Sequence, residues 1–207
     1  VIVAREIGAN NEEKTRRVVH TTVALGIVLS ILMTVSGFFL CNPLLKAMGT
    51  PSDVLPLSNA YLRIYFLGSS AIVMYNMLVG ILRAGGDSTH PLYYLVASSL
   101  INVVLDIVFI TVFKMGVEGA AFATVISEIL SMVLCWVQLV KEDSMIHLNF
   151  RNIRFHKHEL KEILEYGLPT GLQGSVIDIA NVLIQSYINS FGAFAVAGIG
   201  AYSKVEG

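Results

Sequence analysis

The segment Ser98-Ser99-Leu100-Ile101-Asn102-Val103-Val104-Leu105-Asp106 places an amide and a carboxylate four residues apart inside an apolar run. That run, from Pro91 to Phe113, is about 23 residues long and predicts a helix of about 34 Å, enough to cross the hydrocarbon core of a bilayer. At this spacing Asn102 and Asp106 share one helix face. A carboxylate at that depth costs about 2.5–3.5 kcal/mol on insertion scales, so Asp106 is expected to face protein or water and to have a function.

The composition of the whole chain is typical of a polytopic membrane protein with an all-α fold. Of its 207 residues, 55% are hydrophobic and 14% are charged, and the mean hydropathy is +0.69, whereas a soluble domain has about 25% charged residues. The net charge of −1 gives no sign of a nucleic-acid partner. Cys41 and Cys135 lie in apolar segments without metal-type spacing, which indicates buried side chains and no metal site.

Charge-poor stretches outline further spans on both sides of the first one. The expected spans are residues 18–45, 57–82, 91–113, 120–140 and 166–190. Residues 1–4 are interpreted as the tail of an earlier span, and another span is expected to begin near Ala193. Because the chain starts without Met and stops inside an apolar run, we expect a fragment that lacks spans at both ends.

Polar and turn-forming residues are expected to connect these spans. Arg5–Arg17 is predicted to be a connection, with Gly8 and Asn10-Asn11 as turn residues, and Asn42-Pro43 is predicted to stop the span that precedes it. Lys114–Gly119 is predicted to form a turn.

The longest polar stretch, Lys141–Glu165, is interpreted as a linker between two membrane units, residues 1–140 and 166–207. Leu160, Ile163 and Leu164 recur at helical spacing near its end, which predicts an amphipathic surface helix. A new span is expected to open at Tyr166-Gly167-Leu168-Pro169.

The positive residues predict the orientation of the chain in the membrane. Ten Lys and Arg residues lie in the alternate connections Arg5–Arg17, Arg83–His90 and Lys141–Glu165, and two, Lys46 and Lys114, lie in the opposite ones. By the positive-inside rule the first three connections are cytoplasmic in a multi-pass protein of the inner (plasma) membrane.

Six polar side chains inside the spans are candidate site residues: Asn76, Asn102, Asp106, Thr124, Glu128 and Asp178. Desolvation would let Asp106 bind and release a proton near neutral pH, or hold a sodium ion, with Asn102 as its hydrogen-bonding partner. The same groups can also join helices without any transport role. Glu128 is interpreted chiefly as a structural residue, and Asp178 as a possible second polar site.

The glycine-rich turn Gly80–Ser88 is interpreted as structural. No Lys-Ser or Lys-Thr follows the glycines, so it does not match a phosphate loop. Gly86 suits the tight turn, Asp87 is expected to cap the next helix, and Arg83 to interact with the last carbonyls of the previous helix. No ATPase signature occurs in the chain, so any pumping would use an ion gradient or a partner protein.

Five segments together resemble the signatures of one known family. They are Ala4-Arg5-x-x-Gly8-Ala9, the turn Gly80–Ser88 with Pro91, Asn102-x-x-x-Asp106, Val117-Glu118-Gly119-Ala120-Ala121-x-Ala123-Thr124, and Gly167-Leu168-Pro169. In this order they are similar to the multidrug and toxic compound extrusion (MATE) family of cation-coupled exporters. The resemblance extends from the end of that family's second helix to the start of its eighth, so the chain would be an incomplete version of its two-lobe bundle of six plus six helices.

The resemblance is closest to the prokaryotic DinF-like branch and implies a cation or proton site. The matching positions are Asn76, Asn102, Asp106 and Thr124. The branch also uses an aspartate on helix one, which precedes this chain, and a second asparagine where this chain has Val79. The other main branch carries its cation on a helix-seven glutamate, where this chain has Ile177 with Asp178 one place later.

The expected function is therefore antiport, with H⁺ or Na⁺ as coupling ion, no cofactor, and no enzymatic activity. A monomer would export amphipathic, often cationic drugs or metabolites by alternating access. A related flippase for lipid-linked saccharides is the alternative, although it would favour arginines in the cavity and only Arg63, near the end of a span, is available. A membrane enzyme would have Asp106 and Glu128 as its only candidate pair, and a non-transporting scaffold would have no need of Asp106.

Overall fold

The computed structural model describes residues 1–47, 55–141 and 144–189, and all regular structure within them is helical. Contacts divide the chain into two units, residues 1–160 and 161–207, each of which is treated separately. This division lies close to the expected end of the linker at Glu165. The predicted start of another span near Ala193 lies outside the described residues.

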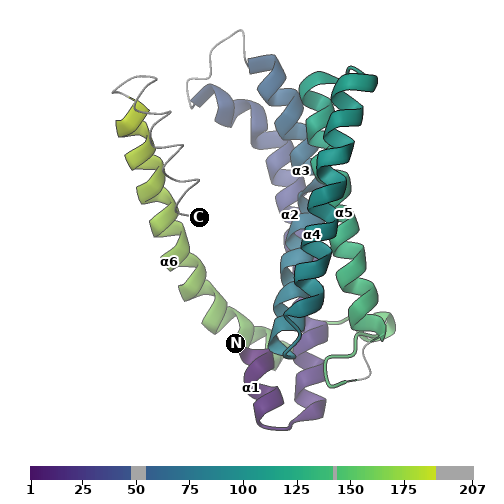
Figure 1. Cartoon of the computed structure of the whole chain (residues 1–207). Coiled ribbons are helices and arrows are strands. Elements are labelled where there is room, and N and C mark those ends of the chain that lie inside the picture. Colours follow the sequence, from purple (N-terminus) through teal and green to yellow (C-terminus); the bar gives the residue numbers. More distant parts are fainter. Residues whose placement is uncertain (48–54, 142–143, 190–207) are drawn as a thin grey trace. The chain divides into compact units, whose positions relative to one another are not determined.

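Four long helices form the first unit: α2 (Glu12–Ala47), α3 (Leu55–Ala84), α4 (Thr89–Ile107) and α5 (Gly116–Lys141). Figure 1 shows them running side by side. Within the described part of the chain, these four helices are the ones long and apolar enough to cross a membrane. The third of these spans consists of α4 and the turn that follows it. The prediction of an all-α membrane bundle is confirmed. The described helix at the expected span 166–190 is not among those long and apolar enough to cross a membrane.

Helix α3 packs against both α2 and α5, and α4 packs against α5. Small residues allow the close approach, since a Cβ atom on Gly68 of α3 would lie 2.3 Å from Cγ2 of Val125 on α5. Two hydroxyl pairs join helices inside the bundle: Thr34 with Ser69 at 3.2 Å and Ser131 with Ser98 at 2.6 Å. The cysteines Cys41 and Cys135 are buried and free, as predicted.

The first connection is shorter than the predicted Arg5–Arg17. Helix α1 (Ile2–Gly8) continues past Arg5, and α2 already begins at Glu12. Asn10 takes a left-handed φ of 53°, and the side chain of Asn11 accepts a hydrogen bond from the backbone N–H of Lys14 at 3.2 Å. The charged residues from Glu12 to Arg17 therefore form the first turns of α2, because Asn11 caps that helix before its apolar part begins.

Two prolines that were predicted to lie at helix boundaries lie inside helices. Helix α2 passes through Pro43 and ends at Ala47, so Asn42-Pro43 does not stop it. Helix α6 (Lys157–Asn189) contains Pro169, so the predicted amphipathic helix and the helix after it are one continuous helix. A proline removes one backbone hydrogen bond but does not end a helix where the surrounding turns remain paired.

The helix that carries Asp106 ends in a π turn, Val108–Val112, which the sequence did not predict. The N–H of Phe113 donates to the carbonyl of Val108 at 3.1 Å, which is the wider spacing of a π-helix. The chain then reverses over fewer residues than the predicted Lys114–Gly119, with Lys114 at φ 54° and α5 starting at Gly116.

After α5 the chain folds back against the bundle. The N–H of Leu148 donates to the carbonyl of Leu139 at 3.1 Å, and the side chains of Ile146 and Leu148 are buried. A short 3₁₀ helix, η2 (Phe150–Asn152), follows, and the ring of Phe150 stacks on Trp136 of α5 with 5.3 Å between centroids. This part of the predicted linker is therefore packed against the helices.

Candidate functional site

Asn102 and Asp106 lie on the face of α4 that packs against α5. Ser98, one turn before Asn102, is buried and bonded to Ser131 of α5, and residues four apart share a face. Both side chains are half-buried, and two of their atoms, Nδ2 of Asn102 and Oδ1 of Asp106, are buried without a hydrogen-bonding partner among the described residues. Buried polar atoms in proteins are usually paired with protein, water or an ion, so these two atoms are the ones of the pair that remain to be satisfied.

The other two predicted cation-site residues lie on neighbouring helices and are bonded to their own backbones. Oγ1 of Thr124 donates to the carbonyl of Ala120 at 3.0 Å, and Nδ2 of Asn76 donates to the carbonyl of Ile72 at 2.8 Å. Asn76 is exposed and Thr124 is half-buried. The structure thus carries the four residues on α3, α4 and α5 without a hydrogen bond that links Asn76 or Thr124 to the pair on α4.

The two possible secondary residues lie on other helices than this pair. Glu128 is half-buried on α5, one turn after Thr124. Asp178 belongs to α6, in the second unit, and its side chain lies outside the described ones.

The glycine-rich turn between α3 and α4 has the geometry of a helix end. Gly86 takes φ 91°, and the N–H of Asp87 donates back to the carbonyl of Leu82 at 3.0 Å. Oδ1 of Asp87 accepts from the N–H of His90 at 3.1 Å, as expected of a carboxylate that caps α4. Arg83 is exposed in the last turn of α3.

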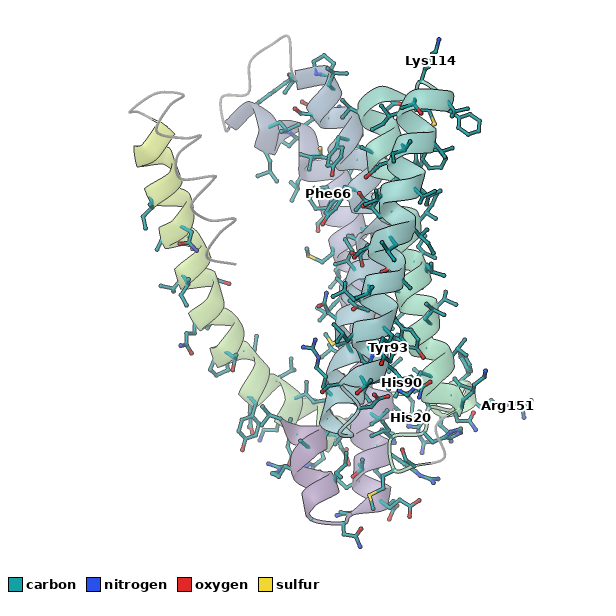
Figure 2. The ribbon with its side chains drawn as sticks, in the orientation of Figure 1. His20, Phe66, His90, Tyr93, Lys114 and Arg151 are labelled. Atoms are coloured by element: carbon teal, nitrogen blue, oxygen red, sulfur yellow. The ribbon has the colours of Figure 1, made fainter. Side chains whose placement is uncertain are left out.

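A second polar site, which the sequence did not predict, lies where α2 meets the segment after α5. Three arginines and three histidines contribute to a cavity of about 290 Å³, the junction cavity, which is lined by Glu13, Arg16, Arg17, His20, His147, Asn149, Asn152, Arg154 and His156. Figure 2 shows His20 and Arg151 at the same end of the bundle and Lys114 at the opposite end. The signal in the sequence was the arginines and histidines of residues 13–20 and 147–156, which lie too far apart in the chain for their spacing to show that they meet.

The partners of two histidines of the junction cavity fix which ring nitrogen donates and which accepts. Nδ1 of His20 lies 2.6 Å from the carbonyl of Arg16, and Nε2 accepts from the N–H of Asn149 at 3.2 Å. A carbonyl can only accept and an N–H can only donate, so His20 carries its proton on Nδ1.

The proton of His156 is assigned in the same way. Nε2 of His156 accepts from Nε of Arg154 at 3.2 Å, so Nδ1 carries the proton and donates to Oγ1 of Thr21 at 3.0 Å. Burial lowers the pKa of His156, and the charge of Arg154 lowers it further.

Comparison with known proteins identifies the fold and the family. The MatE family profile matches residues 1–108, about half of the chain. The chain belongs to the MatE family.

Curated MatE relatives match this chain over nearly its whole length. It is 33% identical over 205 residues to the probable multidrug resistance protein YpnP of Bacillus subtilis (strain 168), covering 99% of this chain and 46% of the relative. It is 24% identical over 198 residues to the multidrug export protein MepA of Staphylococcus aureus (strain MRSA252), covering 96% and 44%. The chain spans about half the length of the curated relatives it matches.

Solved MatE-type structures share the fold. A MOP superfamily transporter from Pyrococcus furiosus is 30% identical with a TM-score of 0.88, over 99% of this chain and 46% of that one. MATE structures in the bent and straight conformations are each 30% identical, with TM-scores of 0.87 and 0.84 over 98% and 96% of this chain and 46% and 45% of theirs. The predicted resemblance to the MATE family is confirmed.

Proposed function

We propose that this chain is part of a cation-coupled antiporter that exports amphipathic, often cationic organic compounds. The curated relatives are named for multidrug resistance and export, which supports the class of transport. The observation that carries the coupling proposal is that Oδ1 of Asp106 and Nδ2 of Asn102, one turn apart on the α5-facing side of α4, are both buried without a hydrogen-bonding partner among the described residues.

In this proposal Asp106 alternates between an ionised and a protonated or sodium-bound form. The ionised carboxylate favours the outward-facing state, and ion binding removes its charge, so that the helices rearrange and the cargo site weakens. Coupling requires that ion and cargo bind the two states with different affinities. Asn102 can donate to the ionised form or accept from the protonated one, because an amide does both. Asn76 and Thr124 would have to leave their own helix carbonyls to join the site.

The alternative of a saccharide flippase has less support from the described side chains. Arg63, the one arginine within the predicted spans, lies with its guanidinium 5.2 Å from the centre of the Phe38 ring. This cation–π contact gives Arg63 a local partner on α2. We therefore favour a small organic cargo over a phosphate-linked one, and we propose a monomeric transporter in the plasma membrane.

Dye efflux from cells that express the whole transporter tests this proposal. Asp106→Asn should abolish gradient-driven efflux, because an amide cannot cycle a proton, while the protein should still fold. Glu118→Gln is the matched control, since Glu118 is exposed in the first turn of α5. Collapse of the proton gradient and removal of sodium, applied separately, identify the ion. Efflux by Asp106→Asn at the wild-type rate would refute the mechanism.

A further inference from the structure

The junction cavity is positively charged, and its arginines supply that charge. Three arginines and one carboxylate, Glu13, line it, and Nε2 of His20 and of His156 each accept a hydrogen bond. Arg16 pairs with Glu12 at 2.7 Å, and Arg17 pairs with Glu13. Arg154 forms no ion pair with a carboxylate among the described residues. The cavity therefore holds the positive charge of Arg154, because a guanidinium stays charged throughout the physiological pH range.

The hydrogen bonds of Arg154 leave part of its guanidinium available. Its Nε donates to Nε2 of His156 at 3.2 Å, and that ring is in turn bonded to Thr21, which is fully buried on α2. This chain of bonds anchors the arginine and leaves the Nη groups to bind something else. Arginine presents its donors in a planar fork that matches the oxygens of a phosphate.

The position of the junction cavity along the helices corresponds to the lipid headgroups. In α2 no charged residue occurs between Arg17 and Lys46, so the apolar part of the helix begins one residue after the arginines of the cavity. On α5, Trp136 stacks on Phe150 of the segment that supplies the other wall. Tryptophan is enriched where the hydrocarbon core meets the headgroups.

We propose that the junction cavity binds the phosphate of an anionic phospholipid headgroup in the leaflet at this end of the bundle. A phosphodiester with net negative charge would lie against Arg154, with Arg16 and Arg17 on the opposite wall. The bound lipid would link α2 to the segment after α5 by a second set of contacts, in addition to the bonds of His20 and His156. The proposal does not depend on the transport mechanism, because Asp106 takes no part in it.

Lipid-dependent stabilisation of the purified protein tests this site. In detergent micelles, phosphatidylglycerol should raise the melting temperature more than phosphatidylcholine does. Arg154→Gln should weaken the apparent affinity for phosphatidylglycerol about fivefold, since each basic residue near a membrane surface contributes about 1 kcal/mol. Arg151→Gln is the matched control, because Arg151 is an exposed arginine of η2 that does not line the cavity.

Two further measurements distinguish loss of binding from loss of folding, and a lipid ligand from a soluble anion. Arg154→Lys keeps the charge and should keep most of the lipid effect, which shows that the site has not simply unfolded. Inorganic phosphate at millimolar concentration should stabilise much less than the lipid. A wild-type protein that phosphatidylglycerol and phosphatidylcholine stabilise equally would overturn the proposal, and so would equal losses in Arg154→Gln and Arg151→Gln. Stabilisation by inorganic phosphate as strong as that by the lipid would instead make the ligand a soluble anion.

Discussion

The N–H of Asn149 donates to Nε2 of His20 at 3.2 Å, so two segments 129 positions apart in the sequence meet through one imidazole nitrogen. The contact needs an unprotonated Nε2. The same condition holds at His156, whose Nε2 accepts from Arg154. The contact between α2 and the segment after α5 therefore contains two histidines that accept hydrogen bonds through Nε2.

Acidification should loosen this contact. The pKa of His156 is lowered in the folded protein, first by burial and then by Arg154, with smaller effects of Arg17 and His20 in the same direction and of Glu159 in the opposite one. The unfolded state then binds more protons, so stability is full above the usual histidine pKa of about 6.5 and is lost as pH falls through the lower folded pKa. Melting curves between pH 8 and pH 5.5 should show this fall, and His156→Gln should show less of it. An unchanged pH dependence in the variant would contradict the assignment.

Glu6 should contribute more to stability than the exposed carboxylates near it. It is buried at 6% exposure and pairs with Arg5 at 2.7 Å and Lys14 at 3.2 Å. Glu6→Gln should cost about 1.5–3 kcal/mol of unfolding free energy, as expected for hydrogen bonds to a charged group. Glu12→Gln, which breaks only the exposed pair with Arg16, should cost about 0.3–0.5 kcal/mol.

The Glu6 contribution should also depend on pH. The hydrogen bond from Arg5 lowers the pKa of Glu6 in the folded protein. Its stabilisation is therefore present above the unfolded carboxyl pKa and is lost as pH falls through the lower folded value. Denaturation of both variants at pH 7 and pH 4 measures this difference, which should shrink at the lower pH. Equal effects of Glu6→Gln and Glu12→Gln at pH 7 would show that the burial of Glu6 has no consequence.

Gly68→Ala should separate α3 from α5. The new methyl group would lie 2.3 Å from Cγ2 of Val125, a β-branched side chain that cannot turn away freely. We expect a loss of about 1–3 kcal/mol by overpacking, and Gly68→Ala combined with Val125→Ala should recover part of it. Gly80→Ala is the control, since nothing lies within 4 Å of its Cβ and alanine should stabilise α3 there. Full stability of the Gly68→Ala single variant would show that the helices are further apart than described.

Thiol labelling can test the predicted orientation. Lys114 and Arg151 lie at opposite ends of the bundle (Figure 2), and both are exposed. In a background without Cys41 and Cys135, Lys114→Cys should react with an impermeant maleimide in intact cells, and Arg151→Cys only after the membrane is opened. The opposite pattern would reverse the orientation inferred from the positive residues.

The spans could be predicted because a bilayer requires long charge-free runs, and the sequence between Arg17 and Lys46 shows this directly. The ends of the helices were less predictable. Pro43 and Pro169 are strong breakers in isolation, but neighbouring turns keep their helices intact. The π turn after Asp106 was not predictable, because its residues, Val-Phe-Ile-Thr-Val, include no glycine or proline that would mark an irregular turn.

The residues of the candidate site could be named from sequence, but their hydrogen bonds could not. Thr124 and Asn76 can bond either across helices or to their own backbones, and spacing does not decide between these options. The junction cavity was missed because its walls come from segments far apart in the chain. No local pattern around His20 indicates that Asn149 will be its partner.

In the π turn at Val108–Val112, successive side chains no longer follow the angular spacing that they have along α4. A π turn accommodates an additional residue, so side chains within the turn no longer continue the stripe on which Asn102 and Asp106 lie. The turn also sets the direction in which the chain leaves this helix for the reversal at Lys114. Removing a single residue from the turn would therefore rotate Phe113 and the start of the reversal relative to Asp106.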